Sequence, residues 1–351
     1  MRKIYIVRHG QIAQEYTDRC ISRTDILLDA VGKEQARSLA EWFLSHSISA
    51  VYTSPLQRCK DTAKIMAGDQ TVCVHPQLAE IQVGAWEGFS FAEIRKKWPA
   101  EYAARGEHMG TTAPPGGESF CDGGERMHQI MQRLLYHTQG DLLVVTHGGI
   151  LRGWLCKITG QSPDQVFSFN LPYGSITEIS VTGNTFQLEK TGYRPTEFPG
   201  PEEIRFLMEK YHTPQEVQRH CLAVADKAME LARGFCVDTK LLYAAALLHD
   251  LCRTEGRDHP QKAADVLKKA GYSKVAELVL VHNDLEAEKE EDICEEAKIL
   301  FLADKLFAGT RPVTLKERFD RSREKCKDDA ALAAWNRRWC LACRLSERYM
   351  R

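Results

Sequence analysis

A short apolar stretch followed by Arg-His-Gly opens the chain and constrains its fold more than any other feature. Residues Ile4 to Val7 predict a buried strand, and Gly10 ends it. Arg8 and His9 therefore stand at the carboxyl end of a strand, where open α/β sheets keep their ligand sites. An arginine beside a histidine at such an edge suits a phosphate, which the guanidinium holds while the imidazole meets the phosphorus atom.

The same arrangement recurs later in the chain. Residues 142–146 form the clearest expected strand, and His147, Gly148 and Gly149 follow it directly. Strands that alternate with helical patterns between the two sites predict a parallel sheet covered by helices on both faces. In such a sheet both histidines point into the crevice above the strand ends. The expected elements are helices over 29–45, 91–98 and 125–137, strands over 50–53, 71–74, 176–181 and 185–188, and a helix with Ser54 as N-cap and Pro55 as first residue.

Length and composition limit the class of protein. The chain has 351 residues, enough for two domains, and 43% of them are hydrophobic and 27% charged. The net charge of −1 predicts binding to neither a nucleic acid polymer nor a membrane, and the apolar runs are too short for a signal peptide or a membrane span. Twelve cysteines without a framework spacing predict reduced thiols and a cytoplasmic location. We interpret the one CxxC, at Cys340 and Cys343, as a coincidence on a helix surface.

Five side chains of the first half form a chemically complete set for phosphomonoester hydrolysis. Arg8 and Arg58 neutralise and orient the phosphoryl group, because its transfer depends mainly on positioning and charge stabilisation. One of the two imidazoles, of His9 or His147, attacks phosphorus and the other donates to a phosphoryl oxygen. The carboxyl group of Glu80 protonates the leaving alkoxide and then takes a proton from water. A histidine that merely caps a loop at a strand end is the simpler alternative.

These residues lie in motifs that resemble the histidine phosphatase superfamily, also called the phosphoglycerate-mutase-like family. Six motifs occur in the family's order over roughly residues 1–190: Arg8-His9-Gly10, Ser54 to Ala63, Leu78-Ala79-Glu80, Gly84 to Gly88, Pro114 to Ser119, and Thr146 to Gly149. The resemblance implies an N-terminal α/β three-layer sandwich. It makes His9 the nucleophile, Glu80 the acid and base, and Arg8, Arg58 and His147 the phosphate ligands, with no metal in this half.

Three further positions refine the resemblance. Gln11 matches a family position that is often Glu or Gln, from which the side chain reaches the phosphate. Ile12 and Glu15 stand where the family often has Thr or Ser and Asn, so we expect an unusual entry side of the pocket. The short form of the loop, with Arg23-Thr24-Asp25 after it, is more similar to small-molecule phosphatases such as α-ribazole phosphatases than to glycolytic mutases. A small phosphorylated metabolite is therefore the expected substrate.

The composition changes between the two halves. Pro195, Pro199, Gly200 and Pro201 interrupt any regular element, so we place a linker at 192–202, between a first domain at 1–191 and a second at 203–351. The second half contains helical patterns without convincing strands and is expected to be all-α. The expected helices cover about 203–211, 214–234, 239–252, 259–270, 273–283, 292–308 and a long stretch after Leu315.

Histidines and aspartates carry the chemistry of the second half. His220 lies in a helical pattern, His249 and Asp250 follow the apolar run 241–248, and Asp304 lies in another apolar helix. Burying an aspartate there is costly unless it is paired or bound to a metal. His259 and His282 fall between them, and the mixed nitrogen and oxygen ligands suit Fe, Mn, Zn or another transition ion better than Mg or Ca.

The same set resembles the HD-domain metal-dependent phosphohydrolases. His220, the doublet His249-Asp250 and Asp304 match the four-residue signature, and His259 and His282 match members that hold two metals. The resemblance implies one or two divalent transition-metal ions, with Fe or Mn favoured, and Asp250 as the bridge between two of them. Among these enzymes the spacing is most similar to hydrolases of diadenosine polyphosphates, which implies a nucleotide-type substrate. Candidate substrate contacts are Arg253, Lys305 and Arg311, for which a solvated charge on a helix surface is the alternative.

The sequence thus predicts a bifunctional phosphohydrolase: a histidine phosphatase fused to an HD phosphohydrolase. Two alternatives stay open. In the first alternative, the first domain acts as a phosphoglycerate-type mutase. In the second, the HD domain senses a nucleotide without catalysis and regulates the phosphatase. The oligomeric state and the substrates of both domains are not fixed by these patterns.

Overall fold

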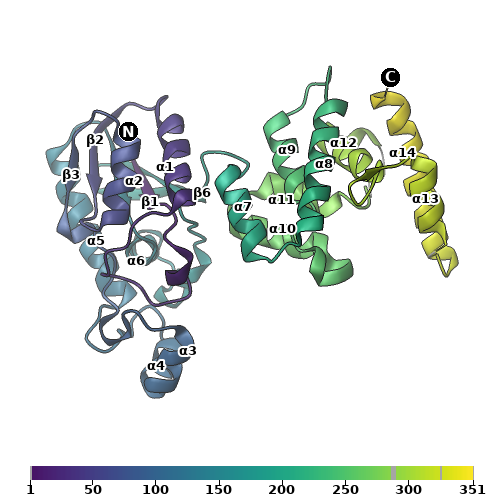
Figure 1. The fold of residues 1–351 in the computed structure, drawn as a ribbon. Helices are drawn as coiled ribbons and strands as arrows, with labels where there is room; N and C mark the ends of the chain where they lie inside the picture. The colour runs from purple at the N-terminus through teal and green to yellow at the C-terminus, as the bar shows by residue number, and fades with distance from the viewer. Residues whose placement is uncertain (1, 286–289, 325, 351) are drawn as a thin grey trace. The chain divides into compact units, whose positions relative to one another are not determined.

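The computed structural model describes residues 2–285, 290–324 and 326–350. The chain divides into two compact units, Met1–Pro195 (unit 1) and Thr196–Arg351 (unit 2). In unit 1 a sheet is covered by helices on both faces, whereas unit 2 is almost entirely helical (Figure 1). The N-terminal α/β three-layer sandwich and the helical second half were both predicted, and the structure confirms them.

The sheet of unit 1 has six strands in the order β3-β2-β4-β1-β5-β6. The first four strands run parallel to one another. Strand β5 pairs antiparallel with β1, and β6 pairs antiparallel with β5. The strands are β1 (Arg2–Arg8), β2 (Ile48–Thr53), β3 (Val72–Val74), β4 (Asp141–Thr146), β5 (Ile176–Thr182) and β6 (Thr185–Tyr193). The last strand continues beyond the expected 185–188 into the segment expected as linker.

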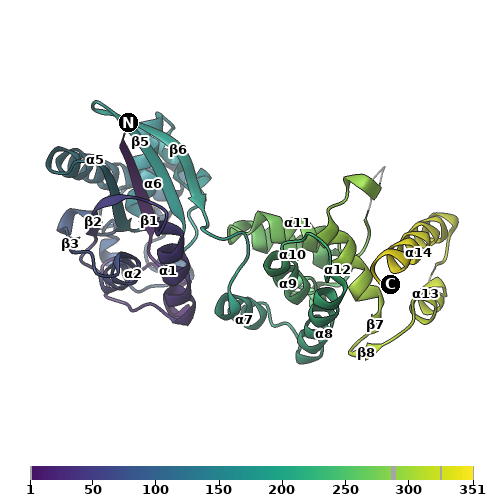
Figure 2. The same cartoon turned by 90° about the horizontal axis from the view of Figure 1, so that it is seen from above.

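Alternate residues of the central strands enter two different hydrophobic cores. Ile4 and Ile6 of β1 pack with helices α5 (Phe120–His137) and α6 (Gly148–Thr159). Tyr5 and Val7 pack on the other face with α1 (Ala30–Phe43) and α2 (Gln57–Ala67). Figure 2 shows from above α1 and α2 on one face of the sheet and α5 and α6 on the other. Because successive side chains of a strand point to opposite faces, a fully apolar strand is suited to a sheet buried on both sides.

Three local expectations for unit 1 were wrong. The helix expected from Ser54 begins at Gln57 with Leu56 as N-cap, and Ser54 uses its hydroxyl elsewhere. Helix α5 begins at Phe120 instead of 125, because Ser119 and Asp122 form a capping box there. Helix α4 (Pro99–Glu107), which follows α3 (Phe91–Lys97), was not expected, since its only fully buried residue is the charged Arg105 and only Tyr102 packs on a hydrophobic cluster.

Unit 2 packs its helices around one large core. The helices are α7 (Pro201–Lys210), α8 (Gln215–Leu231), α9 (Thr239–Leu248), α10 (His259–Lys269), α11 (Ser273–Val281), α12 (Glu295–Lys305), α13 (Leu315–Arg323) and α14 (Asp329–Tyr349). No strand was expected after Glu202, yet β7 (Phe307–Ala308) pairs with β8 (Arg311–Pro312). Strands of two residues are too short to give a period-two pattern in the sequence.

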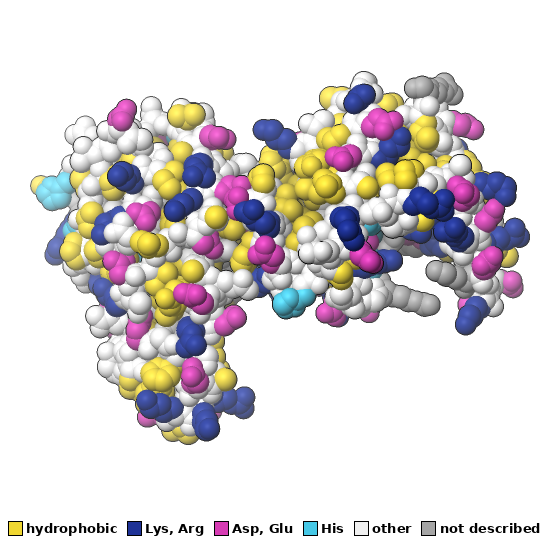
Figure 3. Space-filling model, viewed as in Figure 1, with side chains coloured by type: hydrophobic (Ala, Val, Ile, Leu, Met, Phe, Trp, Pro, Cys, Tyr) yellow, Lys and Arg dark blue, Asp and Glu magenta, His cyan; other side chains and the backbone are white. Residues whose placement is uncertain are grey.

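Hydrophobic side chains gather on one face of unit 2 around an apolar groove of about 1100 Å³ (Figure 3). Residues of α7, α8 and α9 line it, among them Met208, Leu222 and Tyr243. Among the described residues, no helix is both long enough and apolar enough to cross a membrane. All twelve cysteines are free, including Cys340 and Cys343 on α14.

Candidate functional sites

The register of the sheet brings the two strand-end histidines together. Arg8 of β1 pairs with Thr146 of β4, so the next residues, His9 and His147, leave the sheet side by side. Their ring centroids are 5.1 Å apart, and both rings are buried. The two strand-His-Gly segments thus contribute to one site at the carboxyl edge of the sheet.

Each imidazole has one ring nitrogen bonded to the protein. Nδ1 of His9 lies 2.8 Å from the carbonyl oxygen of Gly10, which only accepts, so Nδ1 carries the proton and Nε2 keeps its lone pair. Nε2 of His147 lies 2.7 Å from the hydroxyl of Ser54. That hydroxyl also accepts from the backbone N–H of Leu56 (3.3 Å), and it can donate to Nε2 of His147 or accept from it. The lone pair on Nε2 of His9 is therefore available for nucleophilic attack.

Burial and charge keep both rings neutral. The pKa of His9 is lowered well below its usual value by burial and then by the positive charges of Arg58 and Arg8. Burial and the same cations also lower the pKa of His147. A neutral His9 is the form that can attack phosphorus.

The guanidinium of Arg58 is held by the loop at residues 22–24, part of the segment whose short form resembles small-molecule phosphatases. Arg58 donates to the carbonyl oxygens of Ser22 (2.7 Å) and Thr24 (2.9 Å). On the opposite side of the same loop, the carboxylate of Glu87 accepts from the backbone N–H groups of Ser22 (2.9 Å), Arg23 (3.3 Å) and Thr24 (3.0 Å). The Trp86-Glu87-Gly88 motif therefore fixes the loop that positions Arg58.

Arg8 is held by the loop before β5. It donates to the carbonyl oxygen of Leu171 (2.6 Å), and its guanidinium lies 3.8 Å from the ring centroid of Tyr173. Its Nε is buried without a hydrogen-bond partner in the structure. A buried guanidinium N–H without a partner beside two neutral imidazoles fits an anion.

Glu80 lies at the N-terminus of α6. Its carboxylate accepts from the backbone N–H groups of Gly149 (2.9 Å), Ile150 (2.8 Å) and Ile81 (2.9 Å). A Cβ at Gly149 would come within 2.7 Å of the carboxylate, so this glycine leaves room for Glu80. We expected these glycines to admit a ligand to the backbone, whereas here one admits a side chain.

Gln11 is buried, and its side-chain amide donates to the carboxylate of Asp29 (3.1 Å). Asp29 in turn caps α1 by accepting from the backbone N–H of Gly32 (2.7 Å). The structure therefore gives one N–H of the Gln11 amide a protein partner, and the phosphate contact that the family pattern implied stays a prediction.

In unit 2 the Nε2 atoms of four histidines face the carboxylates of Asp250 and Asp304. His249 and His282 follow the last residues of α9 and α11, and their Nδ1 atoms lie 2.8 and 2.6 Å from the carbonyl oxygens of Ala246 and Val279, three residues earlier. Nδ1 of His259 meets the carbonyl of Gly256 in the same way, at 2.8 Å. Carbonyl groups in the last turn of a helix lack intrahelical partners, so they are free to fix these rings.

The fourth ring, of His220, is oriented from another element. Its Nδ1 lies 2.8 Å from the carbonyl oxygen of Gly309, in the turn between β7 and β8. All four Nδ1 atoms thus donate to backbone carbonyls, and all four Nε2 atoms face the carboxylates of Asp250 or Asp304. This arrangement of a carbonyl behind each imidazole is the usual support of a metal-binding histidine.

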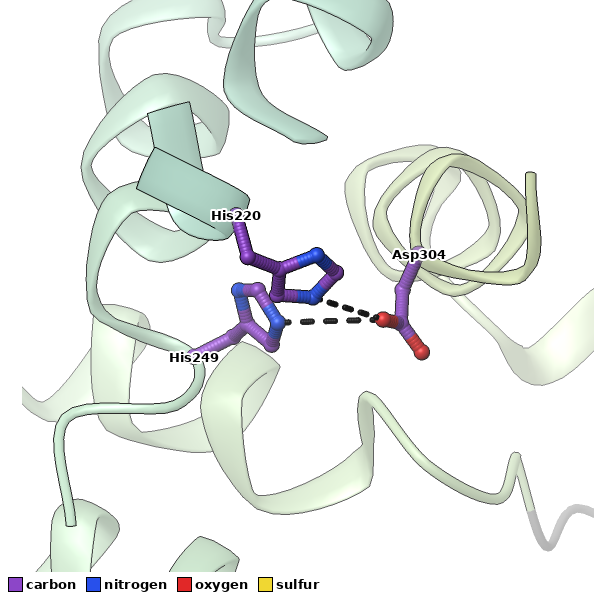
Figure 4. Close-up of side chains that lie close together, drawn as sticks. All are labelled: His220, His249 and Asp304. Atoms are coloured by element: carbon purple, nitrogen blue, oxygen red, sulfur yellow. Dashed lines mark hydrogen bonds and ion pairs between the residues drawn. The ribbon is translucent and has the colours of Figure 1, made fainter. Parts of the chain in front are cut away.

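Asp250 lies between two pairs of these rings. Its Oδ2 is 3.6 Å from Nε2 of His249 and 3.9 Å from that of His220, while its Oδ1 is 2.9 Å from Nε2 of His259 and 3.7 Å from that of His282. Asp304 completes the first pair, with Oδ1 at 3.2 Å from His220 and 3.8 Å from His249 (Figure 4). The six predicted ligands therefore form two adjoining groups that share Asp250.

The polar atoms of this cluster fit a bound cation. Nε2 of His249 is buried without a hydrogen-bond partner among the described residues. Burial lowers the pKa of His249 to about 4, although Asp250 opposes this. Burial alone would raise the pKa of Asp250, but the neighbouring His259 and His282 lower it well below its usual range. A neutral imidazole and an ionised carboxylate are the forms that bind divalent metal ions.

The three candidate substrate contacts of unit 2 lie in different environments. Lys305 is buried and donates to Oδ2 of Asp304 (2.7 Å), so it supports a ligand instead of facing a substrate. Arg253 is half-exposed, with Nη1 3.2 Å from Nε2 of His259 and 3.7 Å from Oδ1 of Asp250. Arg311 is exposed on β8. Only Arg253 reaches the cluster with its charge toward solvent.

Comparison with known proteins agrees with both sites. The model of the histidine phosphatase superfamily (branch 1) matches residues 4–193, more than half of the chain and all five phosphatase residues. The chain belongs to the histidine phosphatase superfamily. The model of the HD domain matches residues 217–309, which include the six clustered ligands of unit 2. The chain is therefore a hydrolase that acts on phosphoester bonds and carries an HD domain.

Several relatives are phosphatases by name. A metal-independent phosphoserine phosphatase of Arabidopsis thaliana is 33% identical over 166 residues, which cover 46% of this chain and 70% of the relative. Putative phosphoserine phosphatase 2 of Hydrogenobacter thermophilus is 29% identical over 188 residues, 52% of this chain and 91% of the relative.

Solved structures match unit 1 as well. YhfR of Bacillus stearothermophilus aligns with a TM-score of 0.51 at 29% identity, over 54% of this chain and 96% of that one. The α-ribazole phosphatase of Shigella flexneri aligns with a TM-score of 0.50 at 25% identity, over 55% of this chain and 96% of that one. The predicted likeness to the phosphoglycerate-mutase-like fold is confirmed.

Proposed function

We propose that unit 1 hydrolyses small phosphomonoesters through a phosphohistidine formed on Nε2 of His9. The observation that carries this proposal is the contact of His9 Nδ1 with the carbonyl of Gly10, which leaves a lone pair on Nε2 of His9 beside the buried ring of His147. The names of the phosphoserine and α-ribazole phosphatases support a small phosphorylated metabolite as substrate.

The reaction proceeds in two steps. Arg8 and Arg58 hold the phosphoryl oxygens while Nε2 of His9 attacks phosphorus, and the P–O bond to the alcohol breaks as Glu80 gives its proton to the leaving oxygen. In the second step Glu80 takes a proton from water, whose oxygen displaces the imidazole and releases phosphate. His147 donates its Nδ1 proton to a phosphoryl oxygen throughout and stabilises the added negative charge.

The test is turnover of an aryl phosphate by the full chain. His9→Ala should abolish both turnover and the acid-labile phosphoenzyme, whereas a chelator should leave the wild-type rate unchanged; the name of the metal-independent relative supports the latter. Full activity of His9→Ala would overturn the proposal. Incubation with 2- and 3-phosphoglycerate separates the alternative, because a mutase interconverts them and a phosphatase releases phosphate.

For unit 2 we propose metal-dependent hydrolysis of a nucleotide-type phosphoester or phosphoanhydride. His220, His249, Asp250 and Asp304 would hold one divalent transition-metal ion, and His259 and His282 would share Asp250 with a second. Their nitrogen and oxygen atoms favour Fe or Mn. When bound, such ions polarise a phosphoryl oxygen and activate water. Arg253, at the exposed edge of the cluster, would contact the phosphates of the substrate.

The alternative for unit 2 is a nucleotide sensor without catalysis. Its discriminating test is the Asp250→Ala variant of the full chain, assayed against dinucleotides and cyclic nucleotides. A catalytic HD domain loses nucleotide turnover in this variant and keeps the aryl phosphatase rate. A sensor shows no nucleotide turnover in the wild type, and added nucleotide changes the aryl phosphatase rate.

A further inference from the structure

The apolar groove of unit 2 runs along helices α7, α8 and α9. Its lining residues include Gln218, Leu222 and Met229 on α8, and Tyr243 and Leu247 on α9. Spacings of four and seven residues place each set on a single face of its helix. Among the described residues, none of the six candidate metal ligands lines the groove. The groove is therefore a separate feature from the metal cluster.

The walls of the groove are mainly apolar. Phe198, which precedes α7, and Ile204 and Met208 of α7 face the residues of α8 and α9 across it. Leu222, in the middle of α8, is 47% exposed. Small-molecule sites enclose roughly 300–1,000 Å³, and the groove measures about 1100 Å³. Because methionine side chains are unbranched and adaptable, a wall that contains Met208 and Met229 suits a flexible apolar chain.

Two unpaired cations flank this apolar surface. Arg219 of α8 and Lys240 of α9 line the groove and are exposed, and neither side chain has a hydrogen-bond or ion-pair partner among the described residues. A third cation of the lining, Arg205, pairs with Glu202. Glu209 is the one acid among the lining residues. The groove therefore carries an excess of positive charge, which favours an anion.

The two unpaired cations lie toward opposite ends of the groove. The chain turns back between α8 and α9, which pack side by side (Figure 1). Lys240, in the first turn of α9, therefore lies beside the last turns of α8, near the level of Met229. Arg219 lies about 15 Å away along α8, at 1.5 Å per residue. A chain extended along the groove would bring its head group to one of these cations in either direction.

We propose that the groove binds a single-chain acyl anion, such as a long-chain carboxylate. The chain lies on Leu222, Met229 and Tyr243, and the carboxylate meets Arg219 or Lys240. A membrane surface fits less well, because the apolar side chains line a hollow instead of projecting from the protein (Figure 3). A helix of another protein also fits less well, because its acidic groups would flank its whole length, whereas the unpaired cations lie only at the two ends.

Calorimetric titration of the full-length protein with octanoate, decanoate and 1-decanol tests the proposal. Decanoate should bind about tenfold more tightly than octanoate, since it buries two more methylene groups. It should bind about two- to fivefold more tightly than decanol, because an exposed ion pair contributes little more. Leu222→Glu should weaken decanoate binding at least tenfold. The double variant Arg219→Gln/Lys240→Gln should remove the preference over decanol and leave the affinity for decanol unchanged.

The matched controls lie outside the groove. Leu44→Glu changes an exposed leucine of unit 1 and Arg337→Gln an exposed arginine of α14, so both should bind decanoate as the wild type does. Leu222→Glu should keep the wild-type unfolding temperature, because Leu222 is half-exposed, which separates lost binding from lost folding.

Three results would overturn the proposal: no binding of decanoate by the wild type, equal affinities of the wild type for decanoate and decanol, or wild-type affinity in Leu222→Glu. Sedimentation of the protein with phosphatidylglycerol vesicles that depends on Leu222, without binding of decanoate, would also overturn it and assign the groove to a membrane surface.

Discussion

The hydroxyl of Ser54 lies 2.7 Å from Nε2 of His147, and in the proposed reaction it donates to that nitrogen, which leaves the imidazole proton on Nδ1. Removing the hydroxyl frees the ring to take the other tautomer, which presents no N–H to the phosphoryl group. We expect Ser54→Ala to lower kcat for an aryl phosphate by about 10- to 100-fold, with a smaller change in KM. Ser45→Ala removes an exposed hydroxyl far from the site and should leave kcat unchanged. Wild-type kcat in Ser54→Ala would contradict the assigned tautomer.

Glu87 should affect phosphate binding although it does not touch the phosphate. Glu87→Ala leaves the N–H groups of Ser22 and Thr24 without an acceptor and releases the carbonyl groups that orient Arg58. We expect competitive inhibition by vanadate to weaken about tenfold and the free energy of unfolding to fall by about 1–3 kcal/mol. Glu93→Ala, which removes a capping carboxylate on exposed α3, should leave vanadate inhibition unchanged. Equal effects of the two variants on vanadate would exclude this role.

Gly149 provides the space that Glu80 occupies. A Cβ at this position would come within 2.7 Å of the carboxylate oxygen, so Gly149→Ala should displace Glu80 from the N-terminus of α6. We expect the rate to fall most for substrates with poor leaving groups, because these depend most on proton donation. The measurement is the slope of log kcat against leaving-group pKa, compared with Glu80→Gln. A uniform loss across leaving groups would place the effect of the substitution elsewhere.

The environment of His9 also predicts a pH dependence. Burial, Arg58 and Arg8 lower the pKa of this imidazole, so below about pH 6.5, the ordinary value, the unfolded chain binds a proton that the folded chain does not. The free energy of unfolding should therefore fall as the pH falls from about 6.5 toward the depressed value. Chemical denaturation of the wild type and His9→Asn between pH 7.5 and 5 measures this contribution. A steeper loss of stability in the variant than in the wild type would contradict the sign.

Metal content should follow the two groups that share Asp250. Asp250→Ala should empty the whole cluster, whereas His259→Ala should lose about one ion per chain and keep the ion held by His220, His249 and Asp304. Removing the metal should also lower the unfolding temperature, because Asp250 and Asp304 are buried. Elemental analysis after anaerobic purification with Fe or Mn measures the content, with exposed His212→Ala as control. An absence of metal in the wild type would count against the proposal.

The sequence was most informative where a local pattern carries its own geometry. The apolar strands before His9 and His147 predicted the sheet, and their register follows from the parallel pairing of β1 with β4. It was least informative where a side chain has a partner distant in the chain. The hydroxyl of Ser54 looked like a helix cap because that local use is common, but its partner lies 93 residues later.

In unit 2 the candidate metal ligands could be predicted from the sequence, whereas the groups that orient them could not. The residue types and order of the six ligands predicted a metal centre, because burying aspartates next to apolar helices is costly unless they are paired or bind a metal. The carbonyl that orients His220 belongs to Gly309, in a hairpin whose strands are too short to leave a pattern. The division of Asp250 between two pairs of rings likewise depends on how His220 within α8 meets the ends of α9, α10 and α11.

By itself, then, the sequence determined the two folds and predicted the residue types of both candidate sites and the chemistry proposed for them, since periodicity and motif spacing are local properties of the chain. The tertiary structure alone decided which nitrogen of His9 carries the proton, the partner of the His147 ring, the support of Arg58 by Glu87 and the partner of Gln11. All but the first of these depend on contacts between segments far apart in the chain, and no local pattern encodes the direction of a hydrogen bond across such a contact.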